Sequence, residues 1–300
     1  GANVLFLCGS TGEGQYIQKH VPEHRATILK AAKEAIDDLN TKIPVIIGIF
    51  GNKPAEVERN IEMISKLQED NLGYDIIDGY VISPPLEKKL EDDELRTYLE
   101  EIIQPLDKAV FLYNNPSTFG DNNISISIYN YLMNKFDTIK GFKDSSPSLK
   151  YKTEIMKIIE DKESISFYTG KEGDFFKCLK VRTPRNSKQI GCIPSIGNVL
   201  NIPSRIITEY NGGNVEKASQ LQDTLNSIRN NIYHEPKTKG KAQRGAKYAL
   251  SCIYKNTNLD REVTVIPDFK REMTGPDKEK IQEAIELATK MKYFDKIDEF

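Results

Sequence analysis

The sequence predicts an α/β protein with the (β/α)8 TIM-barrel fold, in which parallel strands alternate with helices. Short apolar or β-branched runs alternate with segments of helical periodicity, at the intervals of roughly 25 to 35 residues that parallel βαβ units need. A doubly wound open sheet is the structural alternative, but its usual phosphate loop, GxGxxG or GxxxxGK(S/T), does not follow the first run. The strand-like runs are residues 4–8, 43–50, 76–83, 109–113, 138–143, 165–170 and 189–193.

The number of these runs is one short of the expected fold. A closed (β/α)8 barrel needs eight strands, and the sequence offers seven runs. We therefore expect one βα unit to be missing upstream of Gly1.

Helix start signals separate the strand-like runs. Pro22-Glu23 opens the first predicted helix and Pro54 opens the second, because a proline at an early helical position lacks an N–H that would have no partner there. Acidic residues at 92–94 open the third helix, where they complement the positive end of the helix dipole. Beyond Ser204 the pattern is helical only. We predict helices near 214–232, 240–254 and 276–293, so that residues 1–203 form the barrel and residues 204–300 form a C-terminal helical extension packed on it.

Composition and charge exclude several classes of protein. With 38% hydrophobic and 29% charged residues, the chain resembles ordinary globular proteins and differs from disordered, collagen-like or disulfide-scaffold chains. Lys plus Arg (42) nearly balances Asp plus Glu (44), which argues against a nucleic acid or a membrane as partner. The cysteines show no CxxC spacing and the histidines no HExxH pattern, so we expect no metal site. No run approaches the roughly 20 apolar residues that span a bilayer and no signal peptide is evident, so we expect a soluble, cytoplasmic protein.

Polar turns follow the predicted strands, at the end of a barrel where catalytic groups lie. The first strand ends in Gly9-Ser10-Thr11-Gly12-Glu13-Gly14. Its glycines permit a tight turn, and the two hydroxyls with nearby backbone N–H groups can hold a carboxylate or a phosphate. A plain turn followed by a helix cap explains the same hexapeptide equally well.

The fourth and fifth predicted strands end in Tyr113 and in Lys143-Asp144. A tyrosine at the last position of a strand can donate or accept a proton in the barrel mouth, although a packed aromatic with a satisfied hydroxyl is the alternative. A buried lysine can supply a neutral amine that attacks a carbonyl, and a surface lysine at a strand end is the alternative. The sixth and seventh strands lead into Glu172 and Ser195, which offer polar groups to the same mouth or form ordinary turns.

Taken together, the motifs at five of the seven strand ends resemble those of the dihydrodipicolinate synthase / N-acetylneuraminate lyase family. Their order and spacing agree with that family from about residue 3 to residue 230. The motifs are Gly9-Ser10-Thr11-Gly12-Glu13, Tyr113-Asn114-x-Pro116, Gly141-Phe142-Lys143-Asp144, Gly170-x-Glu172, and Gly191-x-Ile193 through Asn198.

The resemblance implies a Schiff-base, pyruvate-handling barrel that needs no metal and no cofactor and that forms a homo-oligomer, a dimer or a tetramer. It implies that Lys143 forms the imine with pyruvate or a 2-keto acid and that Tyr113 moves the proton of the substrate hydroxyl. Ser10 and Thr11 are expected to hold the substrate carboxylate. For substrate binding the resemblance adds contacts to sugar-acid hydroxyls from Glu172 and Ser195.

Three departures from the family pattern bear on the substrate. Family members commonly carry Pro-aromatic-Tyr after the third strand, where this chain has Pro84-Pro85-Leu86. Dihydrodipicolinate synthases have an arginine two residues beyond the proline of the Tyr-Asn-x-Pro motif, and Thr118 stands there. Sialic acid lyases tend to have an acidic pair after Gly-x, whereas Gly173 follows Glu172 here.

The expected function is that of a class I aldolase. It cleaves a 2-keto-3-deoxy sugar acid, of the ketodeoxygluconate or N-acetylneuraminate type, into pyruvate and an aldehyde. A dihydrodipicolinate synthase, or a dehydratase that uses the same imine, is the alternative among enzymes. A family fold that only binds a keto acid is the alternative among binding proteins, although a pure binder needs neither Lys143 nor Tyr113.

Overall fold

The computed structural model describes residues 2–20, 23–70, 75–183, 189–234, 240–256 and 273–291. The chain divides into two compact units. Residues 2–171 and 181–191 form the first, called here the sheet unit, and residues 172–180 together with residues from 192 onward form the second, called here the helical unit.

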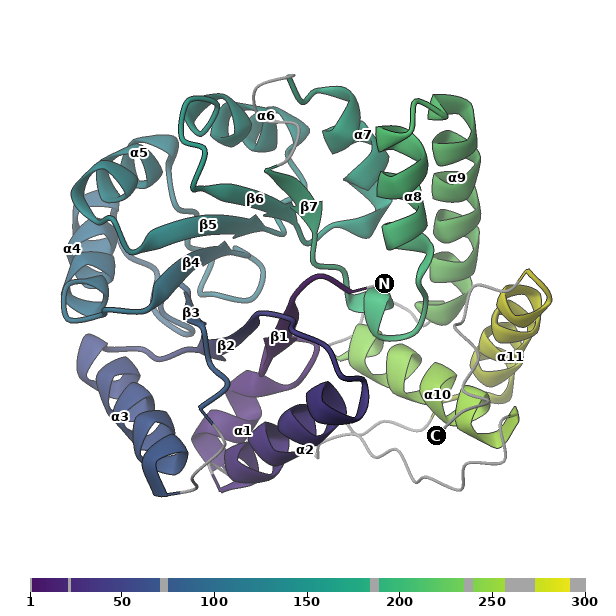
Figure 1. Ribbon diagram of the computed structural model, residues 1–300, viewed down its shortest axis with the longest axis horizontal. Helices are drawn as coiled ribbons and strands as arrows, with labels where there is room; N and C mark the ends of the chain where they lie inside the picture. The colour runs from purple at the N-terminus through teal and green to yellow at the C-terminus, as the bar shows by residue number, and fades with distance from the viewer. Residues whose placement is uncertain are drawn as a thin grey trace. The chain divides into compact units, whose positions relative to one another are not determined.

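Seven strands form one sheet in the order of the sequence, and the neighbouring pairs from β1 to β6 are parallel. This confirms the seven predicted runs and the parallel βαβ pattern. The sheet curls into a half-barrel (Figure 1), with β1 and β7 at the two ends of the order among the strands described. The strands are β1 (Leu5–Leu7), β2 (Val45–Ile49), β3 (Gly79–Ile82), β4 (Ala109–Asn114), β5 (Ile139–Asp144), β6 (Ser166–Thr169) and β7 (Ile190–Cys192).

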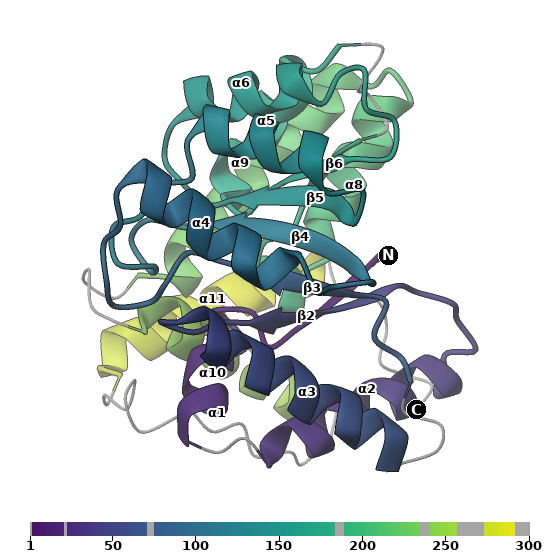
Figure 2. The same ribbon diagram turned by 90° about the vertical axis from the view of Figure 1, so that its left-hand side faces the viewer.

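Helices of the sheet unit cover the outer face of this sheet, as Figures 1 and 2 show. The predicted helix starts at Pro54 and Asp92 are confirmed, and Glu91 closes a capping box with Glu94 at the second of them. The predicted start at Pro22 lies outside the described residues. The helices are α1 (Gly14–His20), α2 (His24–Asp38), α3 (Pro54–Asp70), α4 (Asp92–Ile103), α5 (Ile126–Lys135) and α6 (Leu149–Ile158).

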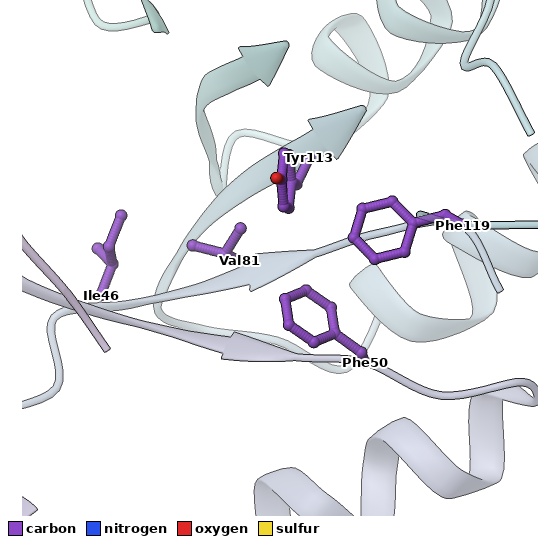
Figure 3. Packing of buried hydrophobic residues seen from close by; sticks show 5 residues of the cluster. All are labelled: Ile46, Phe50, Val81, Tyr113 and Phe119. Atoms are coloured by element: carbon purple, nitrogen blue, oxygen red, sulfur yellow. The ribbon is translucent and has the colours of Figure 1, made fainter. Parts of the chain in front are cut away.

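The two faces of the sheet carry different side chains because strand residues alternate between faces. Toward the inside, one buried cluster joins residues of β2, β3, β4 and the loops that follow β2 and β4 (Figure 3). Toward the helices, the ring of Phe142 on β5 packs against the tilted ring of Tyr129 on α5, with a centroid distance of 4.4 Å. The inner cluster consists of Ile46, Phe50, Val81, Tyr113 and Phe119, with Val4, Phe6, Leu86 and Phe111 packed against it.

The helical unit contains α7 (Phe175–Lys180), α8 (Ile202–Asn211), α9 (Val215–Ile232), α10 (Lys241–Asn256), α11 (Gly275–Lys290) and the short 3-10 helices η1 (Glu172–Asp174) and η2 (Ser195–Asn198). The three helices predicted beyond Ser204 correspond to α9, α10 and α11, and α9 packs against both α8 and α11. In the described part of the chain, none of the helices has the length and apolar character needed to cross a membrane.

Candidate active site

Two candidate catalytic residues lie side by side at the carboxyl ends of β4 and β5. The register pairs Tyr113 with Lys143, so that both side chains point to the inner face of the sheet. Tyr113 is 1% exposed and Lys143 is 8% exposed. Lysines at strand ends are usually exposed. Lys143 is buried, so the alternative of a surface lysine is wrong.

Aromatic rings surround the amine of Lys143. Its Nζ lies 4.2 Å from the centroid of the Tyr113 ring and 4.8 Å from that of Phe6. The edge of one of these rings faces the other, with centroids 6.4 Å apart. The amine thus lies against the faces of two aromatic rings, one of which carries a phenolic hydroxyl. An amine in this place can attack the carbonyl group of a bound keto acid.

The hydroxyl of Tyr113 has three polar neighbours. Ser10 Oγ lies 3.1 Å from Tyr113 Oη, and Asn115 Nδ2 donates to the same oxygen at 3.1 Å. Ser145 Oγ donates to it at 3.5 Å. The first of these contacts brings the turn after β1 next to the end of β4.

These neighbours act on the acidity of Tyr113. Burial on its own raises the pKa of a phenol, since it penalises the charged form. The charge of Lys143 and the hydrogen bonds from Ser10, Ser145 and Asn115 outweigh burial, so the pKa of Tyr113 lies below its ordinary value. A phenol tuned in this way is suited to take up and return a proton.

The turn after β1 brings Ser10 to this place. Gly14 N donates to Gly9 O at 3.1 Å, and a Cβ on Gly14 would stand only 1.8 Å from the carbonyl oxygen of Cys8. Glycine is therefore required at position 14 for the chain to turn back so closely. Thr11 is half-buried in the same turn.

A second glycine makes room for the lysine. A Cβ added to Gly170 would lie 3.2 Å from Lys143 Cε and 2.0 Å from Ser145 Oγ. Gly170 N also donates to Asp144 O at 2.8 Å, which ties the end of β6 to the end of β5. The motif glycine at 170 thus has a steric role next to the amine.

Glu172 and Ser195 belong to the helical unit, where each opens a 3-10 helix. Ser10, Tyr113 and Lys143 are in contact within the sheet unit. Glu172 and Ser195 lie in the helical unit. Glu172 is 4% exposed, and its Oε1 accepts from Arg229 Nε at 3.0 Å. If Glu172 binds substrate as predicted, its carboxylate does so while it is paired with the guanidinium of Arg229.

Two of the three departures from the family pattern, Leu86 and Thr118, lie in the sheet unit, and the third, Gly173, lies in the helical unit. Leu86 packs against the inner cluster that contains Tyr113, so its position presents an apolar surface. Thr118 is half-buried, and its backbone N donates to Asn115 O at 2.9 Å. Both positions are uncharged.

Sequence reasoning missed Asn115, Ser145 and Phe6 as parts of the site. The first two follow Tyr113 and Lys143 by two residues, and the two-residue period of a strand places them on the same face. That spacing was the available signal. Among the described residues, no three His, Cys, Asp or Glu side chains gather in a way that could hold a metal ion.

Comparison with known proteins assigns the family. The profile of the Dihydrodipicolinate synthetase family matches residues 1–258. A 4-hydroxy-tetrahydrodipicolinate synthase of Thermoanaerobacter sp. (strain X514) is 24% identical over 238 residues, which are 78% of this chain and 72% of the relative. A 2-dehydro-3-deoxy-D-gluconate/2-dehydro-3-deoxy-phosphogluconate aldolase of Picrophilus torridus is 25% identical over 262 residues, 87% of this chain and 86% of the relative.

Solved structures share the fold. YagE of E. coli K12, a prophage protein of the dihydrodipicolinic acid synthase family solved in complex with pyruvate, superposes with a TM-score of 0.76 at 21% identity, over 98% of this chain and 88% of that one. A dihydrodipicolinate synthase of Thermotoga maritima has the same TM-score, 0.76, at 15% identity, over 96% and 88% of the two chains. The family match over most of the chain and this shared fold show that the protein belongs to the dihydrodipicolinate synthetase family of lyases.

Proposed function

We propose that the protein is a pyruvate-dependent class I aldolase that acts through a Schiff base on Lys143. Its substrate is a 2-keto-3-deoxy sugar acid of the ketodeoxygluconate or N-acetylneuraminate type, and its products are pyruvate and an aldehyde. The observation that carries this proposal is the placement of a buried amine 4.2 Å from the ring of Tyr113, whose hydroxyl is in turn bonded to Ser10.

The reaction follows from the chemistry of these side chains. Unprotonated Lys143 Nζ attacks the C2 ketone, and loss of water leaves a protonated imine. Tyr113 takes the proton of the C4 hydroxyl, the C3–C4 bond breaks, and its electron pair moves into the imine to give an enamine and the free aldehyde. Protonation at C3 and hydrolysis of the imine then release pyruvate and regenerate the amine. The imine is the electron sink, so the proposed reaction requires neither a metal nor a cofactor.

Binding of the carboxylate is assigned to the turn after β1. Ser10 and Thr11 offer hydroxyls there, and the backbone N–H groups of a glycine-rich turn can add further donors. Glu172 and Ser195 are proposed to contact the hydroxyl groups of the sugar-acid chain. Arg229 donates to one carboxylate oxygen of Glu172, which restricts the rotation of this carboxylate.

The residues at positions 86 and 118 favour an aldolase over a synthase. An arginine at 118 would offer a charged fork to a second carboxylate, such as that of aspartate semialdehyde, whereas Thr118 offers one neutral hydroxyl. Leu86 adds apolar surface beside Tyr113 in place of a further hydroxyl. The alternative function, 4-hydroxy-tetrahydrodipicolinate synthase, is the name of several relatives, so both reactions have to be compared directly.

The test is a comparison of two reactions catalysed by the same purified protein. Pyruvate release from 2-keto-3-deoxygluconate and from N-acetylneuraminate is measured beside condensation of pyruvate with aspartate semialdehyde. A missing charge-assisted contact costs about 1.5 to 3 kcal/mol, so we expect the condensation to be at least about tenfold less efficient, since tenfold corresponds to about 1.4 kcal/mol. A faster condensation would replace the aldolase proposal by the synthase. Absence of all three reactions, with pyruvate still bound, would favour the keto-acid-binding protein.

The proposal extends to the assembly and its setting. We propose that the curled sheet is part of a (β/α)8 barrel and that the protein works as a homo-oligomer in the cytoplasm. Light scattering during size-exclusion chromatography of the purified protein distinguishes a monomer from a dimer or a tetramer. An active enzyme that is purely monomeric would contradict the proposed homo-oligomer.

A further inference from the structure

A buried polar cluster lies on the face of the sheet opposite to the candidate active site. Asn114 and Asp144 are each 0% exposed, and so is Lys152 of α6. The side chains of Asn114 and Asp144 point toward the helices, because strand residues alternate between faces and the neighbouring Tyr113 and Lys143 point inward.

The cluster is bonded throughout. Asp144 Oδ1 accepts from Asn114 Nδ2 at 2.8 Å and from Ser146 N at 3.3 Å. Its second oxygen, Oδ2, accepts from Ser146 Oγ at 2.8 Å and lies 3.0 Å from Lys152 Nζ. The ammonium of Lys152 also donates to the carbonyl oxygen of Ser146.

Asn114 connects this cluster to the segment before α5. Its Nδ2 also donates to Asn123 Oδ1 at 2.9 Å, and its Oδ1 accepts from Ile124 N at 3.1 Å. The main chain adds a link across the two strands, since Ser145 N donates to Asn114 O at 2.8 Å. The ends of β4 and β5 are therefore fastened to each other, to α6 and to the approach to α5.

Stability alone does not account for a charged pair at this place. Taking two ions out of water offsets much of their mutual attraction, and apolar residues of similar volume commonly stabilise such a site as well or better. The distinctive feature is the position: the two residues that bond across the strands are the direct neighbours of the two candidate catalytic residues, in the same register. Because neighbouring residues are joined through the backbone, a shift of Asn114 relative to Asp144 would also move Tyr113 relative to Lys143.

We propose that Asn114 and Asp144, held in place by Lys152, are positioning residues that set the spacing between Tyr113 and Lys143. This inference rests on the proposed imine chemistry for its effect on turnover. Its effect on Tyr113 does not depend on that chemistry, because the hydroxyl of Tyr113 senses the charge of Lys143 whether or not a substrate is present.

The test compares Asn114→Leu with Gln189→Leu. Leucine at 114 removes the bond to Asp144 but leaves the Asp144–Lys152 pair. Gln189 is the matched control, because it is a buried amide of the same unit and donates to Lys162 O. It lies at the amino end of β7, whereas Asn114 lies at the carboxyl end of its strand. Both variants lose buried hydrogen bonds, so both are expected to lower the melting temperature.

Two readouts separate positioning from general stabilisation. The first is steady-state pyruvate release: Asn114→Leu should lower kcat at least about tenfold with little change in KM, since the carboxylate-binding turn is untouched, and Gln189→Leu should leave kcat unchanged. The second is the pH titration of Tyr113, followed as the ultraviolet difference between each protein and the same protein carrying Tyr113→Phe. Asn114→Leu should raise the pKa of Tyr113 toward its ordinary value of about 10, and Gln189→Leu should not change it.

Each outcome decides the inference. Turnover per folded molecule and a Tyr113 titration that both match wild type in Asn114→Leu would overturn it. If Asn114→Leu does not fold, Ser146→Ala removes only hydroxyl bonding to Asp144, and it should shift both readouts in the same direction by a smaller amount; unchanged readouts would again overturn the inference. If the wild-type protein releases no pyruvate, the proposed function fails, and the Tyr113 titration alone judges the positioning role.

Discussion

Replacing Tyr113 by phenylalanine separates proton transfer from packing. The change keeps the ring that lies 4.2 Å from Lys143 Nζ and removes only the hydroxyl bonded to Ser10, Asn115 and Ser145. A positioned acid or base typically supplies on the order of 10² to 10⁴ in rate, which is about 2.7 to 5.4 kcal/mol of transition-state stabilisation. The half-buried partners left without the hydroxyl cost about 1 kcal/mol of folding free energy.

Tyr98→Phe is the matched control for this variant. Tyr98 lies on α4 in the same unit, is 6% exposed, and donates its hydroxyl hydrogen to Gly51 O at 3.0 Å. Its loss of stability should be comparable, but no change in turnover is expected. The assay is pyruvate release from 2-keto-3-deoxygluconate, with chemical unfolding in parallel. If Tyr113→Phe turns over as fast as Tyr98→Phe, the hydroxyl of Tyr113 only satisfies its neighbours and the proton-transfer role is wrong.

Two further changes test the surroundings of the site. Gly170→Ala places a methyl group 3.2 Å from Lys143 Cε and 2.0 Å from Ser145 Oγ, so we expect slower formation of the pyruvate adduct and a stability loss of about 1 to 3 kcal/mol. Gly275→Ala is the control and should behave as wild type, because the added carbon meets nothing within 4 Å apart from its own stretch of helix. Equal behaviour of the two variants would contradict the steric role. Burial raises the pKa of the Cys8 thiol from 9.0 to about 11, so its protonated form stabilises the fold below pH 9 and this contribution, about 2 to 3 kcal/mol, is lost as the pH rises to 11. The free energy of unfolding is measured in urea for wild type and Cys8→Ala from pH 9 to pH 11, and the difference between the two proteins should shrink as the pH rises. A difference that does not depend on pH would refute the raised pKa of Cys8.

The sequence was sufficient to predict the sheet and the two residues at the carboxyl ends of β4 and β5. Hydrophobic periodicity predicted all seven strands, since strands of a parallel sheet are buried on both faces and appear as nearly continuous apolar runs. The strand-end rule then placed Tyr113 and Lys143 at one edge of the sheet, and the register of β4 and β5 confirms that they are neighbours.

The polar partners of these residues were harder to predict. Asn115 and Ser145 lie just beyond the strands, where the two-residue period still holds but a turn is the expected structure. Lys152 belongs to a helix, and lysine at helical positions is almost always exposed, so nothing in the pattern indicates that it is fully buried against Asp144. Such a pairing depends on how α6 packs on the sheet, which is a tertiary property.

The central claim is that Lys143 forms a covalent imine with pyruvate. The most direct test is to incubate the protein with pyruvate, reduce with borohydride and locate the adduct by peptide mass spectrometry. We expect one reduced pyruvyl group on the peptide that contains Lys143, and none in Lys143→Arg, because a guanidinium stays protonated and does not attack a carbonyl. An adduct on another lysine, or no adduct in the folded wild-type protein, would contradict the mechanism.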